Sequence, residues 1–304
     1  MTPLHLVDSF DYAQNNCFQH QLWKTLDRVT QVEHCALSTL DRAMRHGPRP
    51  IVCCLKQRTL RREIERIAAS VGDSPIVVYD QDPWEAFKDG APGYGTYQLA
   101  ASRLNVRSFA VTTRLWTDVI TERGMPANFV RMWMLPEYCE SERSHERRTI
   151  NVGFIGSVHP RRQRLFDALN DLGVHVKVIA GGLAYHDFLK SLSDIRIFVN
   201  NQDDEFTVDG VPMNMRDTMW VRDVEAAARG CFVIRNHGKE HDTYLTGIKT
   251  ILRYESIDQI PDMIRDIEGT TSAQRQAIID DAVGVIRETD AWTQTANALV
   301  KLAS

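Results

Sequence analysis

The stretch that decides the fold is MNMRDTMWVRDVEAAARGCFVI, residues 213–234, because a helical pattern and a strand pattern meet in it. It predicts a helix over 218–229, which Gly230 ends. A buried strand is predicted directly after it, over 231–234. A helix that leads at once into a buried strand indicates an alternating α/β fold.

Apolar, β-branched runs recur on both sides of this stretch, with helical patterns between most of them. We predict strands at 4–7, 51–55, 76–79, 109–112 and 129–135 in the first half, and at 150–155, 174–179 and 195–199 in the second. A polar loop is predicted between the last of these strands and the stretch above. Strands that alternate with helices form parallel sheets, so two doubly wound domains are expected.

The charged segment PEYCESERSHERRT, residues 136–149, has no apolar periodicity and reads as a linker or hinge. We therefore expect an N-terminal domain over 1–140, a linker over 141–149 and a C-terminal domain over 150–285. A last helix, 286–304, is expected to pack back on the N-terminal domain.

Composition excludes several classes of protein. With 304 residues, 43% of them hydrophobic, the chain can build two domains but has no run of about twenty apolar residues for a membrane span. Asp8 and Asp11 interrupt the N-terminal segment where a signal peptide needs apolar residues, so a cytoplasmic protein is expected. A net charge of −4 does not favour a dedicated nucleic-acid binder.

Charged side chains of the deciding stretch can gather on one helix face. Asp217 and Glu225 are eight residues apart, a little over two helical turns, and Arg222 lies between them. A carboxylate suits the paired hydroxyls of a ribose, and an arginine suits a diphosphate. The alternative is a surface helix with ordinary ion pairs.

A second motif is NVGFIGSVHPRRQRLFDAL, in which a predicted strand ends at Gly156 and Ser157, before a helix that begins near Pro160. The helix opens with arginines, namely Arg161, Arg162 and Arg164. A glycine turn, a helix N-terminus and guanidinium groups together make an anion site. The alternative is a plain turn followed by a solvated helix face, and the segment alone leaves both open.

The segment RDVEAAARGCFVI resembles the signature "R, two residues, E-A-x-A-x-G-x-x-V-I" of group 1 retaining glycosyltransferases, particularly the branch similar to the spore maturation protein CgeB. FIGSVHPRRQRLFDAL and VVYDQDPWEAF resemble further segments of that branch. The resemblance covers most of 150–270 and, more loosely, 50–140. It implies the α/β GT-B fold, in which two Rossmann-like parallel-sheet domains face a central cleft, with no essential metal.

The resemblance also implies roles for residues on the donor side. Glu225 would hold the donor ribose and Arg222 the diphosphate, whereas Asp217 stands where the wider group has a glutamate. The expected donor-binding set is Gly156, Ser157, Arg161, Arg162, Arg216, Arg222, Glu225 and His237. The expected catalytic residues are Arg222, Asp217 and Asp82.

On the acceptor side, the candidates follow predicted strands of the first half, because sites collect at the carboxyl ends of parallel strands. They are Asp8, Tyr12, Asn16 and Trp84. For Asp80 and Asp82 the alternative is turn chemistry before Pro83, and for Trp84 it is ordinary packing.

One motif is set aside. His237, Glu240 and His241 match the H-x-x-E-H zinc pattern, which requires both histidines on one helix. Gly238 and the strand that precedes it argue against that helix, so no metal site is predicted.

The resemblance thus implies a metal-independent, hexosyltransferase-like enzyme that moves a sugar from a nucleotide-diphosphate sugar, a UDP-sugar above all, to an acceptor hydroxyl with retention. No tightly bound cofactor is expected. One alternative is a DNA glycosyltransferase acting on a hydroxymethylated base, suggested by the arginine-bearing helix predicted over 57–66. The other is a non-catalytic nucleotide-binding module. A glycan, a small molecule, a protein and modified DNA all remain open as acceptors.

Overall fold

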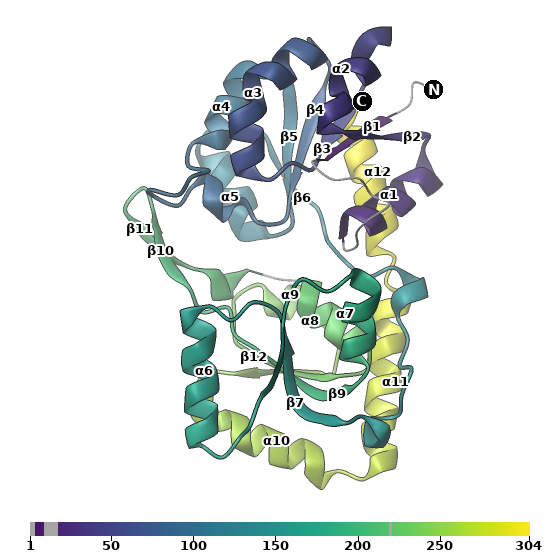
Figure 1. Ribbon diagram of the computed structural model, residues 1–304, viewed down its shortest axis with the longest axis vertical. Helices are drawn as coiled ribbons and strands as arrows, with labels where there is room; N and C mark the ends of the chain where they lie inside the picture. The colour runs from purple at the N-terminus through teal and green to yellow at the C-terminus, as the bar shows by residue number, and fades with distance from the viewer. Residues whose placement is uncertain (1–3, 9–17, 219–220) are drawn as a thin grey trace. The chain divides into compact units, whose positions relative to one another are not determined.

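The computed structural model describes residues 4–8, 18–218 and 221–304 of the chain (Figure 1). They form two compact units, each described by itself below. Unit 1 contains the chain up to Met132, the segment Phe206–Met213 and the C-terminal segment Ala291–Ser304. Unit 2 contains Trp133–Glu205 and Asn214–Asp290.

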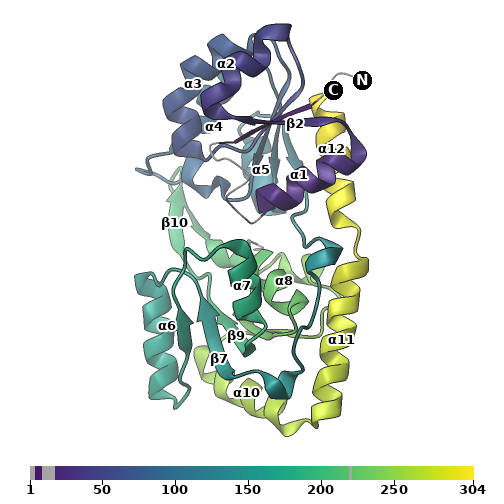
Figure 2. The ribbon, with the colours of Figure 1, turned by 45° about the vertical axis from the view of Figure 1, so that its right-hand side comes forward.

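Unit 1 is built on a six-stranded sheet with the order β2-β1-β3-β4-β5-β6, in which every pairing is parallel. Its strands are β1 Leu4–Asp8, β2 Val32–Ala36, β3 Ile51–Cys53, β4 Ile76–Asp80, β5 Val106–Val111 and β6 Ala127–Phe129. The α-helices are α1 Phe18–Val29, α2 Leu40–Ala43, α3 Gln57–Val71, α4 Thr96–Arg103, α5 Arg114–Glu122 and α12 Ala291–Ala303. The C-terminal α12 packs against β3, β4 and β5, and Figures 1 and 2 both place it beside α1.

The core of unit 1 is apolar and aromatic. Val52 and Val77 in the central strands are completely buried. The rings of Tyr97 and Phe109 stack with their centroids 4.3 Å apart. Burial of such side chains supplies most of the driving force for folding, which explains why the apolar runs of the sequence coincide with the central strands.

A hairpin forms where the sequence predicts only a polar loop. It consists of β10 Glu205–Val208 and β11 Val211–Asn214, and its outer part, 206–213, belongs to unit 1. Asp209 at the turn has a φ of +50°, a conformation that aspartate tolerates better than most residues. The hairpin was missed because each of its strands has only four residues, and Phe206 is ordered by packing against Trp84 and Trp116, which are distant in sequence.

Unit 2 is built on a five-stranded sheet with the order β13-β12-β9-β7-β8, also parallel throughout. Its strands are β7 Ile150–Ile155, β8 Lys177–Ile179, β9 Ile195–Asn200, β12 Phe232–Asn236 and β13 Ile251–Tyr254. The α-helices are α6 Pro160–Asp171, α7 Tyr185–Leu192, α8 Val221–Ala228, α9 His241–Tyr244, α10 Ile260–Gly269 and α11 Ser272–Glu288. After β8 the chain crosses to the other side of β7, so the strand order reverses between β7 and β9. Ligands bind at the carboxyl edge of such a switch point in open α/β sheets.

The segment that connects the halves of the chain lies within unit 2. Arg148 is 1% exposed and donates hydrogen bonds to the carbonyls of Ile195, at 2.8 Å, and Arg229, at 2.7 Å. Trp133 donates from Nε1 to the Ile286 carbonyl at 3.0 Å.

The predicted strand over 129–135 is wrong, because β6 ends at Phe129 and the apolar residues after it pack in the core without pairing as a strand. The expected linker, 141–149, has no apolar periodicity. It is held in unit 2 by hydrogen bonds from the buried Arg148 side chain.

Among the helices of the described residues, none is both long enough and apolar enough to traverse a bilayer.

Candidate functional site

Two glycine turns meet at the carboxyl edge of unit 2, beside the switch point. Gly156 follows β7 with a φ of +140°, and its amide donates to the Ile179 carbonyl of β8 at 3.1 Å. A Cβ on Gly181 would lie 3.3 Å from the backbone of Gly156 and from the amide nitrogen of Ser157. A Cβ on Gly156 would lie 2.9 Å from Nη1 of Arg222. The positive φ of Gly156 favours glycine, the lack of a side chain at Gly181 allows the two turns to approach closely, and Arg222 of α8 reaches this point.

Arg162 is the buried member of an arginine group around these turns. It is 5% exposed, its guanidinium lies 4.8 Å from the centroid of the Phe154 ring, and Nη1 donates to the Ser157 carbonyl at 2.8 Å. Burial and, to a smaller extent, the nearby cations Arg222 and Arg161 together lower the pKa of Arg162 to about 10. A buried arginine is not part of a solvated helix face, so the anion-site interpretation is the better one for this segment.

The other arginines of this motif differ in their surroundings. Arg161 forms an ion pair with Asp204, and its Nε, like that of Arg162, is buried without a hydrogen-bond partner among the described residues. Arg164 points to solvent. Arg161, which is paired with Asp204, together with Arg162 and Arg222 forms the group hereafter called the arginine cluster, beside a turn whose backbone can approach a ligand closely. Mutual repulsion of the guanidinium charges is relieved when an anion binds between them.

Glu225 lies one turn after Arg222 on α8 and is 6% exposed. Its Oε1 accepts a hydrogen bond of 2.9 Å from the hydroxyl of Tyr185 on α7. Burial raises the pKa of Glu225, whereas the Tyr185 hydrogen bond and the charge of Arg222 lower it. Tyr185 was not predicted, because only the packing of α7 against α8 brings it to Glu225. The pair presents a buried carboxylate of the kind that binds neighbouring hydroxyl groups.

Asp217 does not share a helix with Glu225, so the predicted common face is wrong. It ends a separate 3-10 turn, Met215–Asp217, and the chain bends at Thr218 before α8. The Asn214 side chain accepts from the Arg216 amide at 2.9 Å and so forms this turn in place of a continuous helix. Asp217 instead pairs with Lys239, whose Nζ lies 3.4 Å from Oδ2.

The loop after β12 packs against the same turn. A Cβ on Gly238 would lie 1.8 Å from the carbonyl oxygen of Arg216, so only glycine fits there. His237 lies 3.9 Å from Glu255, and Arg216 is exposed. His241 begins α9 whereas His237 precedes it, so the two histidines of the H-x-x-E-H pattern do not share a helix, although their ring centroids lie 6.0 Å apart. The described residues contain no group of three or more side chains suited to hold a metal ion.

A buried ion pair that the sequence analysis missed supports this edge of unit 2. Asp223 and Arg235 are both fully buried and form a salt bridge through Nη1 and Oδ2 at 2.5 Å. Asn200 donates to the other Asp223 oxygen at 2.7 Å, and Arg235 donates to the Gln202 side chain at 3.1 Å. The four residues tie α8 to the carboxyl ends of β9 and β12. They hold the helix that carries Arg222 and Glu225.

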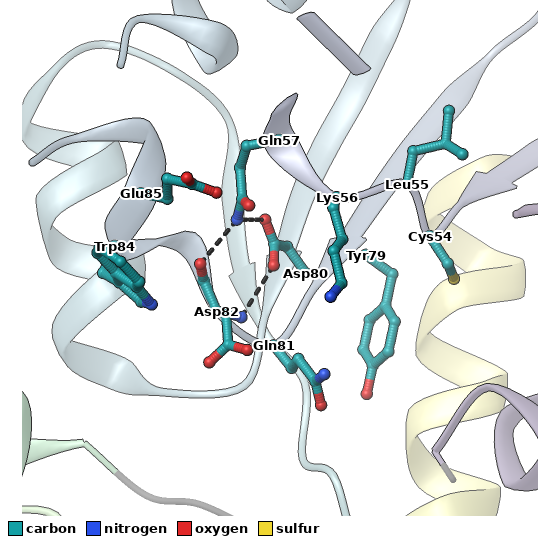
Figure 3. Close-up of a pocket in the computed structure, with 10 residues that line it drawn as sticks. All are labelled: Cys54, Leu55, Lys56, Gln57, Tyr79, Asp80, Gln81, Asp82, Trp84 and Glu85. Carbon is teal, nitrogen blue, oxygen red and sulfur yellow. Dashed lines mark hydrogen bonds between the residues drawn. The ribbon is translucent and has the colours of Figure 1, made fainter. Parts of the chain in front are cut away.

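Unit 1 has a pocket of about 170 Å³ at the carboxyl ends of β3 and β4 (Figure 3). Asp80 lies at its base and accepts hydrogen bonds from Gln57, from the Tyr97 hydroxyl at 2.8 Å and from the Asp82 amide at 2.8 Å. Burial raises the pKa of Asp80 to about 6, although these hydrogen bonds oppose the shift. Asp82 and Trp84 line the same pocket. Asp80 therefore stabilises the turn before Pro83, which is the alternative interpretation of this residue. The same turn also lines the pocket.

The other acceptor-side candidates are not brought into this pocket. Asp8 is buried at the end of β1, and it is not among the residues that line the pocket. Tyr12 and Asn16 lie outside the described residues.

No protein-family model matches the sequence, and no curated protein matches it. Solved structures do match. An α-glucosyltransferase in complex with UDP-glucose and DNA containing an abasic site aligns with a TM-score of 0.64 and 7% identity, covering 98% of both chains. HepE of Anabaena, in complex with UDP and glucose, aligns with a TM-score of 0.62 and 10% identity over 99% of both chains. The sucrose-phosphate synthase of Thermosynechococcus elongatus aligns with a TM-score of 0.63 and 9% identity, covering 99% of this chain and 98% of that one. The chain therefore has the GT-B fold, with two Rossmann-like units, as the sequence predicts.

Proposed function

We propose that the protein is a glycosyltransferase that moves a sugar from a nucleoside-diphosphate sugar, a UDP-sugar above all, to an acceptor hydroxyl with retention at the anomeric carbon. The observation that carries the proposal is the arginine cluster at the glycine turn of unit 2. Three arginines beside a close-approach turn at a topological switch point form a site for a diphosphate. Several structures with the same fold hold UDP or UDP-glucose.

The donor is positioned by groups that flank the arginine cluster. Glu225 accepts hydrogen bonds from the ribose hydroxyls, with Tyr185 fixing the orientation of its carboxylate. Arg222 and Arg162 meet the diphosphate oxygens near Ser157. Arg216 and His237, which border the turn at Asp217, contribute to the outer wall of the donor site.

The reaction forms a bond between the acceptor oxygen and the anomeric carbon and breaks the bond from that carbon to the diphosphate oxygen. The acceptor proton passes to the departing diphosphate. Negative charge develops on the diphosphate as the bond breaks, and the guanidinium groups stabilise it more strongly than they stabilise the bound donor. This electrostatic contribution needs no metal ion and no dedicated carboxylate base.

A thermal-shift screen over nucleoside diphosphates and their sugars tests the proposal directly. A ligand present at a hundred times its Kd stabilises the protein by about 2.7 kcal/mol, which gives a clear rise in the melting temperature. The sugar donor that gives the largest rise is then incubated with the protein, and release of the nucleoside diphosphate is measured. Absence of a shift with every nucleoside diphosphate contradicts the proposal. A shift without any turnover favours the non-catalytic nucleotide-binding module instead.

The DNA-directed alternative depends on the arginines of α3. In unit 1 these side chains have protein partners, since Arg58 pairs with Glu85, Arg62 pairs with Glu63, and Arg61 donates to the Tyr94 carbonyl at 2.7 Å. The ion pairs of Arg58 and Arg62 lower the positive potential that attracts phosphates. Duplex DNA containing hydroxymethylated bases should therefore bind weakly even at low salt, and tight, salt-sensitive binding in a gel-shift titration would revive this alternative.

A further inference from the structure

We propose that the pocket at the carboxyl ends of β3 and β4 in unit 1 is the acceptor site, and that the acceptor is a neutral carbohydrate. This inference rests on the proposed function, because it names the substrate that receives the sugar. It concerns unit 1 alone and depends on the side chains that line the pocket.

The polar groups of the pocket match the hydroxyl groups of a sugar. Figure 3 shows the polar ends of Lys56, Gln81 and Asp82 between Trp84 on one side and Leu55 and Cys54 on the other. Lys56 offers donors, Asp82 offers acceptors, and the Gln81 amide offers both. A sugar hydroxyl donates and accepts at once, so a mixed set of this kind suits it better than a set of one type.

Trp84 supplies the flat apolar surface that a sugar ring requires. It is partly exposed at the pocket, while Phe206 of the hairpin contacts it with the ring centroids 6.4 Å apart. Lys88 Nζ lies 5.5 Å from the centroid of the Trp84 ring. The indole is thus supported by neighbours, and the C–H face of a pyranose can pack on what remains uncovered.

The charge of the pocket argues against anionic acceptors. Its lining contains Asp80, Asp82 and Glu85 against Lys56, and Lys88 lies over the Trp84 ring. Glu85 is paired with Arg58, so the two aspartates balance the two lysines. A phosphate backbone would find no excess of positive charge here, whereas a neutral polyol needs none. The arginine cluster of unit 2 is rich in positive charge, which assigns the anionic donor and the neutral acceptor to different units.

Buried hydrogen bonds hold the pocket wall in one conformation. Gln57 donates both to Asp80 and to the carbonyl of Asp82 at 2.7 Å, while Asp80 accepts from the Asp82 amide and from Tyr97. Asp80 and Gln57 therefore act as positioning residues for the turn that carries Asp82. A wall that is already ordered costs little conformational entropy when the ligand binds.

The test measures glycan binding and nucleotide binding separately on the full chain. Saturation-transfer NMR and titration calorimetry are applied with a panel of maltose, cellobiose, lactose, trehalose and methyl glucosides, and UDP binding is measured by calorimetry on the same samples. The variants are Trp84→Ala, Trp84→Phe and Asp82→Asn. Asp118→Asn, an exposed aspartate of α5 in the same unit, is the matched control.

We expect at least one glycan of the panel to bind. Trp84→Ala and Asp82→Asn should each weaken it by tenfold or more, while Trp84→Phe retains most of the affinity and Asp118→Asn changes nothing. The Kd for UDP should stay within twofold in every variant. If Trp84→Phe retains its glycan affinity and UDP binding is unchanged, the effect of Trp84→Ala is due to loss of a stacking surface and not to loss of the fold.

Four results would overturn the inference. Binding of UDP without binding of any glycan, or glycan binding that the three pocket variants leave unchanged, removes the carbohydrate site and leaves the proposed function standing. Binding of a hydroxymethylated DNA duplex that Asp82→Asn weakens places a different acceptor in the pocket. Failure of UDP and of every other nucleoside diphosphate to bind refutes the proposed function, and the acceptor role of the pocket is then refuted as well, even if glycans bind.

Discussion

Asp80 of unit 1 and Asp223 of unit 2 are both buried carboxyl groups near the carboxyl edge of a parallel sheet, yet their surroundings are opposite. Asp80 meets neutral donors, namely Gln57, Tyr97 and a backbone amide, and burial raises its pKa to about 6. Asp223 meets the guanidinium of Arg235 at full burial. The same architecture thus supports a pocket with three carboxyl groups in one unit and an arginine-rich site in the other. Charge, more than fold, distinguishes what the two edges can bind.

The largest effect should come from breaking the buried ion pair of unit 2. Asp223→Ala leaves Arg235 as a buried charge without its counterion, which typically costs about 3–5 kcal/mol. We expect the free energy of unfolding of unit 2, measured by hydrogen exchange in β9 and β12, to fall by this amount. Asp258→Ala, at an exposed position of the same unit, serves as the control. Equal protection in the two variants would show that the pair does not support α8.

In unit 1 we expect a change in the free energy of unfolding of similar size, but one that depends on pH. The folded state raises the pKa of Asp80 from 3.8 to about 6, so between these values the folded protein binds more protons than the unfolded chain. The stability contributed by Asp80 is therefore present at low pH and is lost as pH rises through about 6, by about 3 kcal/mol in all. Asp80→Asn removes this titration, so the variant should gain stability relative to the wild type between pH 4 and pH 7. Urea unfolding of both proteins across that range measures the difference, and a constant difference would contradict the raised pKa.

The contribution of the arginine cluster to catalysis should be somewhat smaller. Arg222→Ala removes a charge-assisted contact of about 1.5–3 kcal/mol, so kcat/KM for the sugar donor should fall at least tenfold. We expect Asp217→Asn to have a lesser effect, because Asp217 pairs with Lys239. Arg265→Ala, on the exposed face of α10, should leave the rate unchanged. An unchanged rate for Arg222→Ala would remove Arg222 from the mechanism.

The smallest effect concerns the hydrogen bond between Tyr185 and Glu225. Tyr185→Phe keeps the ring but removes the donor to Oε1, a loss of about 0.5–1.5 kcal/mol. Calorimetry should show UDP binding weakened by about two- to tenfold. Phe188→Leu, a neighbouring position on α7, tests whether ring packing alone produces the same change. Equal losses in both variants would mean that the hydroxyl does not position Glu225.

Much of the fold could be predicted because burial and periodicity are local properties of the chain. The strands at Ile76–Asp80, Ile150–Ile155 and Phe232–Asn236 coincide with apolar runs, and their alternation with helices leads to parallel sheets. The pairing of Gly156 with arginines at the start of α6 was also visible, because a glycine turn and a helix N-terminus are neighbours in sequence.

The errors have a common physical cause. Asp217 and Glu225 have helical spacing, but the Asn214 side chain forms a local turn that periodicity does not detect. The apolar run after Phe129 reads as a strand, although its residues are buried by packing against α11. The hairpin at 205–214 is ordered by contacts with Trp84 and Trp116, which are distant in sequence.

The sequence by itself determined the fold class, the parallel sheets and the glycine turn with its arginines, because each depends on residues that are close along the chain. Only the tertiary structure decided that Arg222 joins Arg161 and Arg162, that Tyr185 meets Glu225 and that Asp80 shapes a pocket with Gln57 and Tyr97. Those contacts join separate elements, and the free energy that selects them comes from packing and from the need to satisfy buried polar groups. A sequence pattern does not record which distant partner satisfies a buried charge.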